Sequence, residues 1–255
     1  MRVAFVGKGG AGKSSIAGVF ARLLARRGER VLALDSDPMP GLAYSLGVPS
    51  ADAGIPAEAV EEYDGPDGRQ RYRLRAGLDA AAAIERYATI SPDGVRLVQL
   101  GKARGVKGEN SFSHNAFQGI IDGLAADDSW NVVGDLPGGT RQPFFGWGRY
   151  ARTVLVVVEP TPASLLSGRR LARLAQHQSA PRVGVIANKI REPSDVALVE
   201  RRTGLPVIGQ VPNDDAQGEA DRRGVALLDL DSQAPMVSAI ESLVSSLAEE
   251  EIAVR

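Results

Sequence analysis

The stretch Gly7–Ser15 carries the residue types best suited to hold a phosphate group. It matches G-x-x-x-x-G-K-[ST], a glycine-rich loop whose backbone N–H groups converge on phosphate oxygens. In this pattern Lys13 reaches the β- and γ-phosphates, and the hydroxyl of Ser14 is an oxygen ligand for Mg²⁺. The residues predicted to bind phosphate here are Gly9, Gly10, Ala11, Gly12, Lys13, Ser14 and Ser15.

Aspartates follow two further apolar runs. Asp35 and Asp37 come directly after one run, and Asp135 ends another. Ligands of open parallel sheets bind at the carboxyl ends of the strands, so these side chains are expected near the phosphate loop. There, one aspartate can lie near Mg²⁺ and another can orient an attacking water. An Asp-x-Asp-Pro sequence also forms turns, but its place beside the loop favours the functional interpretation. Gly138 can present its N–H to a γ-phosphate and respond to its presence.

The hydrophobic pattern predicts the elements that must position these residues. The expected strands are 2–6, 30–34, 95–100, 130–134, 153–158, 182–187 and 205–211. The expected helices are 14–26, 115–125, 163–176, 218–224 and 235–251. This alternation predicts an α/β fold, a mainly parallel sheet with helices on both faces, in a single domain over residues 1–255. Residues 50–115 form a less regular, insertion-like segment, with an arginine-guarded edge strand at 69–75 and a loop at 102–113.

Composition excludes several kinds of chemistry. The chain has 255 residues, 44% of them hydrophobic, which is enough to bury a full core. It has no cysteine, so disulfides, thiolate nucleophiles and cysteine-ligated zinc or iron–sulfur clusters are excluded. The net charge of −1 provides no general field for nucleic acid or anionic lipid. The first expected strand begins at Arg2 and no apolar run reaches the length of a membrane span. We therefore expect a cytoplasmic protein without a membrane or nucleic-acid partner.

Five motifs resemble, in order, those of a known class. Lys8–Ser15 resembles the deviant phosphate loop K-G-G-x-G-K-[ST] of the MinD/ParA/nitrogenase-iron-protein class, marked by its extra first lysine. Asp35–Pro38 resembles the switch I motif of that class, and 135–138 its switch II. Asn188-Lys189 and Val211–Asp214 resemble its two adenine-contacting segments. The resemblance extends from residue 1 to about residue 230.

The resemblance implies a three-layer P-loop NTPase fold and hydrolysis of ATP to ADP and phosphate with Mg²⁺. It implies a homodimer that forms on ATP binding, in which Lys8 reaches the partner's nucleotide, and a water positioned by Asp37. The implied catalytic residues are Lys8, Lys13 and Asp37, and the implied Mg²⁺ ligands are Ser14, Asp35 and Asp135. The implied ATP contacts beyond the loop are Gly138, Asn188, Lys189, Pro212, Asn213 and Asp214. From the residues alone, the amide of Asn188 could equally cap a turn.

Within the class, the segments 35–47 and 156–165 resemble the nickel-insertion ATPases of carbon monoxide dehydrogenase. That group carries a Cys-x-Cys pair near residue 110, where this chain has Ser111-Phe112-Ser113. Hydroxyls do not hold a soft or borderline metal as thiolates do, which argues against nickel transfer through this stretch.

Three outputs of the nucleotide cycle are compatible with the motifs. The first is maturation or assembly of a client protein, favoured by the nickel-ATPase-like segments. The second is a ParA/MinD-type positioning ATPase, for which the basic run 69–75 is the only support. The third is a nucleotide-gated regulator that docks a partner through Phe144, Phe145 and Trp147.

Overall fold

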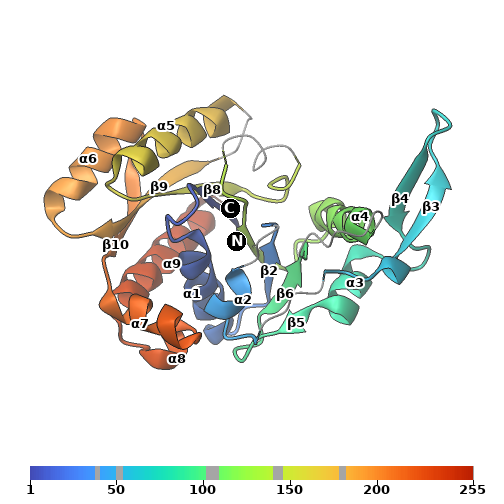
Figure 1. Ribbon diagram of the computed structural model, residues 1–255, viewed down its shortest axis with the longest axis horizontal. Coiled ribbons are helices and arrows are strands. Elements are labelled where there is room, and N and C mark those ends of the chain that lie inside the picture. Colours follow the sequence, from blue (N-terminus) through green and yellow to red (C-terminus); the bar gives the residue numbers. More distant parts are fainter. Residues whose placement is uncertain (38–40, 50–53, 102–108, 140–145, 178–181, 255) are drawn as a thin grey trace.

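The computed structural model describes residues 1–37, 41–49, 54–101, 109–139, 146–177 and 182–254. In these ranges the elements follow one another as shown in Figure 1. Their order is β1 (Arg2–Gly7), α1 (Lys13–Arg26), β2 (Val31–Asp35), α2 (Leu42–Ser45), η1 (Ala57–Ala59), β3 (Val60–Asp64), β4 (Gln70–Leu74), α3 (Ala80–Tyr87), β5 (Thr89–Ile90), β6 (Arg96–Gln99), α4 (Glu109–Gly123), η2 (Leu124–Ala126), β7 (Asn131–Asp135), β8 (Thr153–Val158), α5 (Pro162–His177), β9 (Val183–Ile190), α6 (Pro193–Thr203), β10 (Val207–Pro212), α7 (Asp215–Arg223), α8 (Leu227–Leu230) and α9 (Pro235–Val254).

The main sheet has eight strands in the order β10-β9-β8-β1-β7-β2-β6-β5. All neighbouring pairs are parallel except β5 with β6. The chain runs from β1 outward to β2 and β6, then returns through β7 and passes β1 to reach β8. This reversal of strand order around β1 opens a crevice at the carboxyl ends of the strands. A separate antiparallel pair, β3 with β4, projects from one side of the molecule (Figure 1).

Helices cover both faces of the sheet because the side chains of each central strand alternate between two cores. Val3 and Phe5 of β1 pack in the core beneath α1 and α9. Ala4 and Val6 of the same strand pack in the core beneath α4, α5 and α6. No helix in the described ranges has the length and hydropathy that a membrane span requires.

The predicted fold class is confirmed, and each predicted strand is present within one to three residues of its expected ends. The prediction of a loop over 102–113 is wrong for its second part, because α4 already begins at Glu109. The polar residues before the apolar stripe belong to the helix, where polar side chains are common in the first turn. Residues 102–108 lie outside the described ranges. Helix α6 was not expected, and the single-domain boundaries stay a prediction.

Candidate functional site

The loop between β1 and α1 lies at the end of the central strand. Gly10 and Gly12 have φ angles of 83° and 91°, left-handed conformations that glycine adopts without strain. The Ala11 N–H donates to the Lys8 carbonyl at 3.1 Å. The backbone of the loop then leads into the N-terminus of a 14-residue helix. A glycine loop joined to a helix N-terminus is an arrangement that binds anions.

Asn188, near the end of β9, contacts this loop directly. Its Nδ2 donates to the Ala11 carbonyl at 2.7 Å. A Cβ atom added at Gly12 would lie 2.3 Å from the same Nδ2, so a glycine is needed there for close approach as well as for its φ angle. One N–H of the side-chain amide is thus used in holding the loop, and its second N–H and its carbonyl oxygen remain for a ligand.

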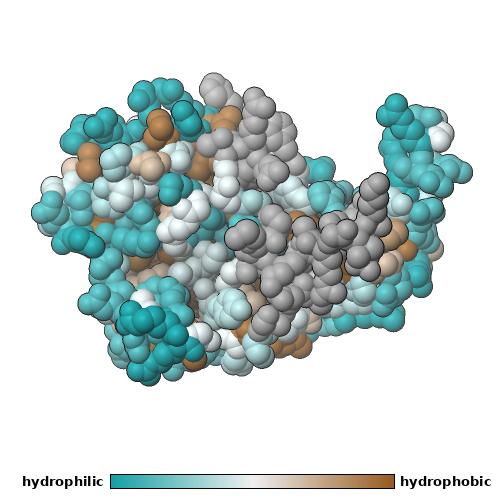
Figure 2. Space-filling model, in the orientation of Figure 1, coloured by the Kyte–Doolittle hydropathy of each residue, from teal (hydrophilic) through white to brown (hydrophobic). Residues whose placement is uncertain are grey.

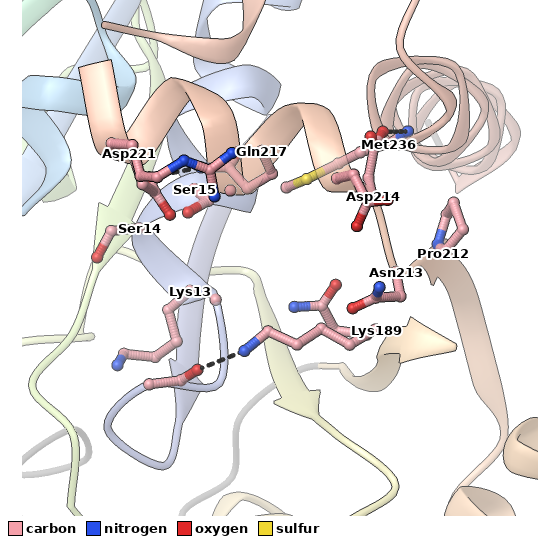
Figure 3. A pocket seen from close by; sticks show the side chains of 16 residues that line it. Lys13, Ser14, Ser15, Lys189, Pro212, Asn213, Asp214, Gln217, Asp221 and Met236 are labelled. Atoms are coloured by element: carbon pink, nitrogen blue, oxygen red, sulfur yellow. Dashed lines mark hydrogen bonds between the residues drawn. The ribbon is translucent and has the colours of Figure 1, made fainter. Parts of the chain in front are cut away.

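Lys189 forms a second contact with the loop. It adopts φ 56°, a region that few non-glycine residues occupy and that is concentrated at functional sites. Its Nζ donates to the Gly10 carbonyl at 3.1 Å (Figure 3) and forms an ion pair with Glu159 Oε1 at 2.5 Å. Lys189 therefore links the loop to the end of β8.

Asp35 and Asp135 are direct neighbours at the ends of the paired strands β2 and β7. They are 0% and 1% exposed. The two carboxylate oxygens of Asp35 accept from the N–H groups of Asp37 and Leu42, each at 3.1 Å. The hydroxyl of Ser14 donates to Asp135 Oδ2. Burial raises the pKa of both carboxyls, and the charge of Asp35 raises the pKa of Asp135 further.

The oxygen atoms of this cluster fit a hard divalent cation. Asp135 Oδ1 is buried and has no hydrogen-bond partner among the residues that the structure describes. A cation there would stabilise carboxylates whose charged form burial disfavours. Mg²⁺ is commonly bound by one or two carboxylates together with water and substrate phosphates. In the described part of the chain no group of three or more His, Cys, Asp or Glu is arranged to hold a metal ion.

The two lysines of the loop have different surroundings. Lys13 is 6% exposed and lines the cavity described below. Lys8 is exposed, and its Nζ contacts only the Gly9 carbonyl, at 3.3 Å, in the described part of the chain. A Cβ at Gly138 would lie 2.9 Å from the Gly9 nitrogen, so the segment after β7 touches the phosphate loop. Asp37 is half-buried just beyond the end of β2.

A cavity of about 840 Å³ lies beside the loop (Figure 3), within the size range of small-molecule sites. Its walls come from the loop, the first turn of α1, the ends of β9 and β10, helix α7 and the start of α9. The sequence-predicted residues among its lining are Gly10, Gly12, Lys13, Ser14, Ser15, Asn188, Lys189, Pro212, Asn213 and Asp214. The tertiary structure thus brings the phosphate loop and both segments expected to contact adenine to one cavity.

Asp214 organises the wall of the cavity that lies away from the loop. Its two carboxylate oxygens accept from the N–H groups of Ala216 and Met236, each at 2.9 Å, which joins the starts of α7 and α9. Helix α7 adds Gln217 and Asp221 to the lining, and neither was expected from the sequence. Their position directly after β10 was a usable signal, because loops and helices that follow parallel strands border the ligand crevice.

Three predicted residues lie outside the described ranges, namely Pro38, Phe144 and Phe145. Trp147 is half-buried and packs against Phe117 of α4, with ring centroids 5.3 Å apart. The described part of the aromatic cluster therefore packs partly against the body of the protein.

The fold and this site define a nucleotide-binding α/β protein. Residues 3–227 match the family model of the CobQ/CobB/MinD/ParA nucleotide binding domain, and the chain belongs to this family. The family resemblance inferred from the motifs is confirmed.

Individual relatives agree with this assignment. The chain is 28% identical over 245 residues to the carbon monoxide dehydrogenase accessory protein CooC of Rhodospirillum rubrum, with 90% of each chain covered. It is similar in structure to a ParA family ATPase from Chlorobium tepidum, with a TM-score of 0.72, 19% identity and 96% and 98% of the two chains covered. It is also similar to MinD of Pyrococcus horikoshii complexed with Mg-ADP, with a TM-score of 0.70, 16% identity and 96% and 94% covered. At these identities the two structural likenesses establish the shared fold.

Proposed function

We propose that the chain binds ATP with Mg²⁺ and hydrolyses it to ADP and phosphate. The observation that carries this proposal is the hydrogen bond from Ser14, in the phosphate-loop segment, to Asp135, whose other carboxylate oxygen is buried without a partner among the described residues. A hydroxyl and a carboxylate at the end of a phosphate loop are the combination that phosphoryl-transfer sites use. The MinD structure complexed with Mg-ADP supports the same ligands for this fold.

We assign each group a role from its place in the motifs. The loop amides and Lys13 would hold the phosphates, while Ser14, Asp35 and Asp135 would hold Mg²⁺. The ion would neutralise charge that develops on the phosphate oxygens. Asp37 orients the attacking water. Such sites gain most of their rate from positioning and electrostatic stabilisation.

The base-binding part of the site is proposed to lie at the ends of β9 and β10. The side-chain amide of Asn188 has a second N–H and a carbonyl oxygen, which together would match the donor and acceptor on the edge of adenine. Pro212 and Asn213 line the same part of the cavity. Asp214 keeps this wall in place through its two backbone hydrogen bonds. Lys189 acts on the loop as well as on the nucleotide.

We further propose that ATP joins two copies of the chain. Lys8 supports this because it is an exposed cation on the phosphate loop, able to reach a nucleotide held by a second copy. The contact of the Gly138 segment with the loop gives the γ-phosphate a route to switch II. ATP would close the dimer and hydrolysis would open it, so the output is a conformational cycle.

The proposed biological role is the maturation or assembly of a client protein, which can be a metalloprotein. Its support is the 28% identity to the CooC accessory protein over 90% of both chains. Because the chain contains no cysteine, the proposal does not include transfer of nickel through a thiolate pair.

Two variants separate nucleotide binding from turnover. Lys13→Ala removes the phosphate-binding cation, so we expect weak binding of a fluorescent ATP analogue and no hydrolysis. Asp37→Ala should bind the analogue as the wild type does but release phosphate at least about tenfold more slowly. Unchanged hydrolysis in both variants would refute the mechanism.

The dimer is tested separately by sedimentation of the ATP-loaded Asp37→Ala protein. Adding Lys8→Ala to this background should prevent dimer formation, whereas adding Arg71→Ala, which also removes an exposed cation, should not. A dimer that still forms without Lys8 would contradict the proposal that Lys8 reaches a nucleotide held by the second copy.

A further inference from the structure

A second concave site lies between α5 and α6 and shares no lining residue with the nucleotide cavity. It has a volume of about 440 Å³. Its lining consists of Arg169 and Arg173 from α5, Arg201 and Arg202 from α6, and Thr203 and Gly204. We call it the arginine groove. Figure 2 shows mainly hydrophilic side chains at the upper left, over α5 and α6, with scattered hydrophobic ones between them.

The four guanidinium groups are exposed, and none forms an ion pair or a side-chain hydrogen bond within the described part of the chain. Helix α5 itself contains no acidic residue. The end of α7 offers a comparison, because its last two arginines, Arg222 and Arg223, both pair with Glu219. The arginine groove therefore differs from a helix end whose charges are neutralised within the protein.

Local helix stability accounts for only half of this cluster. Arg201 and Arg202 lie in the last turn of α6, where a cation interacts favourably with the helix dipole. Arg169 and Arg173 lie in the interior of α5, one turn apart on the same face, where like charges destabilise a helix. Bringing both pairs to one groove adds repulsion that an anionic ligand would relieve.

The topology places the groove away from the nucleotide. The chain passes from β8 through α5 to β9, and from β9 through α6 to β10, and these strands are parallel. Both helices must therefore run back toward the amino ends of the strands. Arg201 and Arg202 lie in the last turn of α6, whereas Arg169 and Arg173 lie nearer the middle of α5. None of the four arginines lines the nucleotide cavity. A partner in the groove would leave the nucleotide cavity accessible.

We propose that the arginine groove is a docking site for an acidic segment of a partner protein. Guanidinium groups bind carboxylates through paired N–H donors, and a compact set of four suits a short run of aspartate or glutamate. A nucleic acid needs positive charge that continues along its backbone. Helix α6 carries the acidic residue Glu200 immediately before Arg201, and the acidic residues Glu192 and Asp195 lie at its start. Acidic side chains therefore interrupt the positive charge along α6.

The inference gives the chemistry of a partner for the proposed function but does not depend on ATP hydrolysis. It is tested by fluorescence anisotropy with a labelled decaglutamate peptide, at one fixed ionic strength and without nucleotide. The wild type should bind this peptide, and the double variant Arg169→Gln/Arg202→Gln should bind it at least about tenfold more weakly. Thermal unfolding and ATP-analogue binding of the variant should match the wild type.

The matched control is Arg71→Gln/Arg223→Gln, which loses the same charge at two exposed arginines that pair with Asp67 and Glu219. It should bind the peptide within twofold of the wild type. If both double variants bind the peptide equally weakly, net charge alone explains the binding and the proposal is overturned. Failure of the wild type to bind the peptide would also overturn it. The same assay is repeated with a DNA duplex of equal charge and with phosphatidylglycerol vesicles. If either binds more tightly than the peptide, and the groove variant loses that binding, the partner bears phosphate groups and the proposal is overturned.

Discussion

Replacing Glu159 with glutamine tests whether the ion pair with Lys189 positions the phosphate loop. Glu159→Gln keeps the size of the side chain and removes its charge. The pair joins atoms 2.5 Å apart, with side chains that are 17% exposed for Glu159 and 47% for Lys189. Solvent around the exposed Lys189 screens the attraction, while Glu159 is largely buried. The energy of this ion pair is therefore near the upper end of the range for exposed pairs, about 1 kcal/mol. If this energy holds Lys189 against the Gly10 carbonyl, losing it weakens nucleotide binding roughly fivefold.

The assay is titration of the Mg²⁺-loaded protein with a fluorescent ADP analogue, which avoids any contribution from hydrolysis. Glu159 does not line the cavity, so its effect must pass through Lys189. The double variant Glu159→Gln/Lys189→Met should therefore bind no more weakly than Lys189→Met alone. Glu200→Gln is the matched control, because Glu200 accepts a hydrogen bond from the Val207 N–H and does not contact the loop.

Two results would refute this reasoning. One is ADP binding by Glu159→Gln within a factor of 1.5 of the wild type. The other is additive weakening in the double variant, which would mean that the two residues act independently. A large fall in the unfolding temperature of Glu159→Gln without nucleotide would assign the pair to stability instead.

Further changes have defined expectations. Gly12→Ala should abolish nucleotide binding and destabilise the protein by about 1–3 kcal/mol, because its Cβ would meet Asn188 at a φ of 91°; ADP-analogue titration and thermal unfolding check this. Asp135→Asn should raise the Mg²⁺ concentration needed for half-maximal phosphate release about tenfold or more, and an unchanged requirement would remove Asp135 from the metal site. Arg22→Met should lower the free energy of unfolding by about 2–3 kcal/mol, because Arg22 is 1% exposed and bound to two carboxylates; denaturant unfolding measures it. Arg22 lowers the pKa of Asp229, so stability from this pair is present above the ordinary aspartate range and is lost as pH falls through the lowered value. The free energy of unfolding of Arg22→Met should accordingly change less than that of the wild type as the pH falls below the ordinary aspartate range. The same pH dependence in both proteins would contradict this.

The sequence was sufficient to predict the elements whose signals are local. The phosphate loop is recognisable because its glycines, Lys13 and Ser14 are contiguous and lie between an apolar strand and an amphipathic helix. Asp35 and Asp135 could be predicted to lie near each other because each ends a buried strand, and the carboxyl ends of parallel strands meet at one edge. The start of α4 at Glu109 could not be predicted, because polar residues in a first helical turn resemble a loop.

Contacts within the site depended on the order of the strands. The pairing of β7 between β1 and β2 brings Ser14 to Asp135, which is 121 residues away in the chain. The placement of β9 beyond β8 brings Asn188 and Lys189 to the loop across 177 and 179 residues. The motif alone predicted a nucleotide contact for Lys189, whereas its links to Gly10 and Glu159 emerged only in the folded chain. Periodicity and motifs report on neighbours along the chain, but which distant side chains meet is decided by strand order and packing.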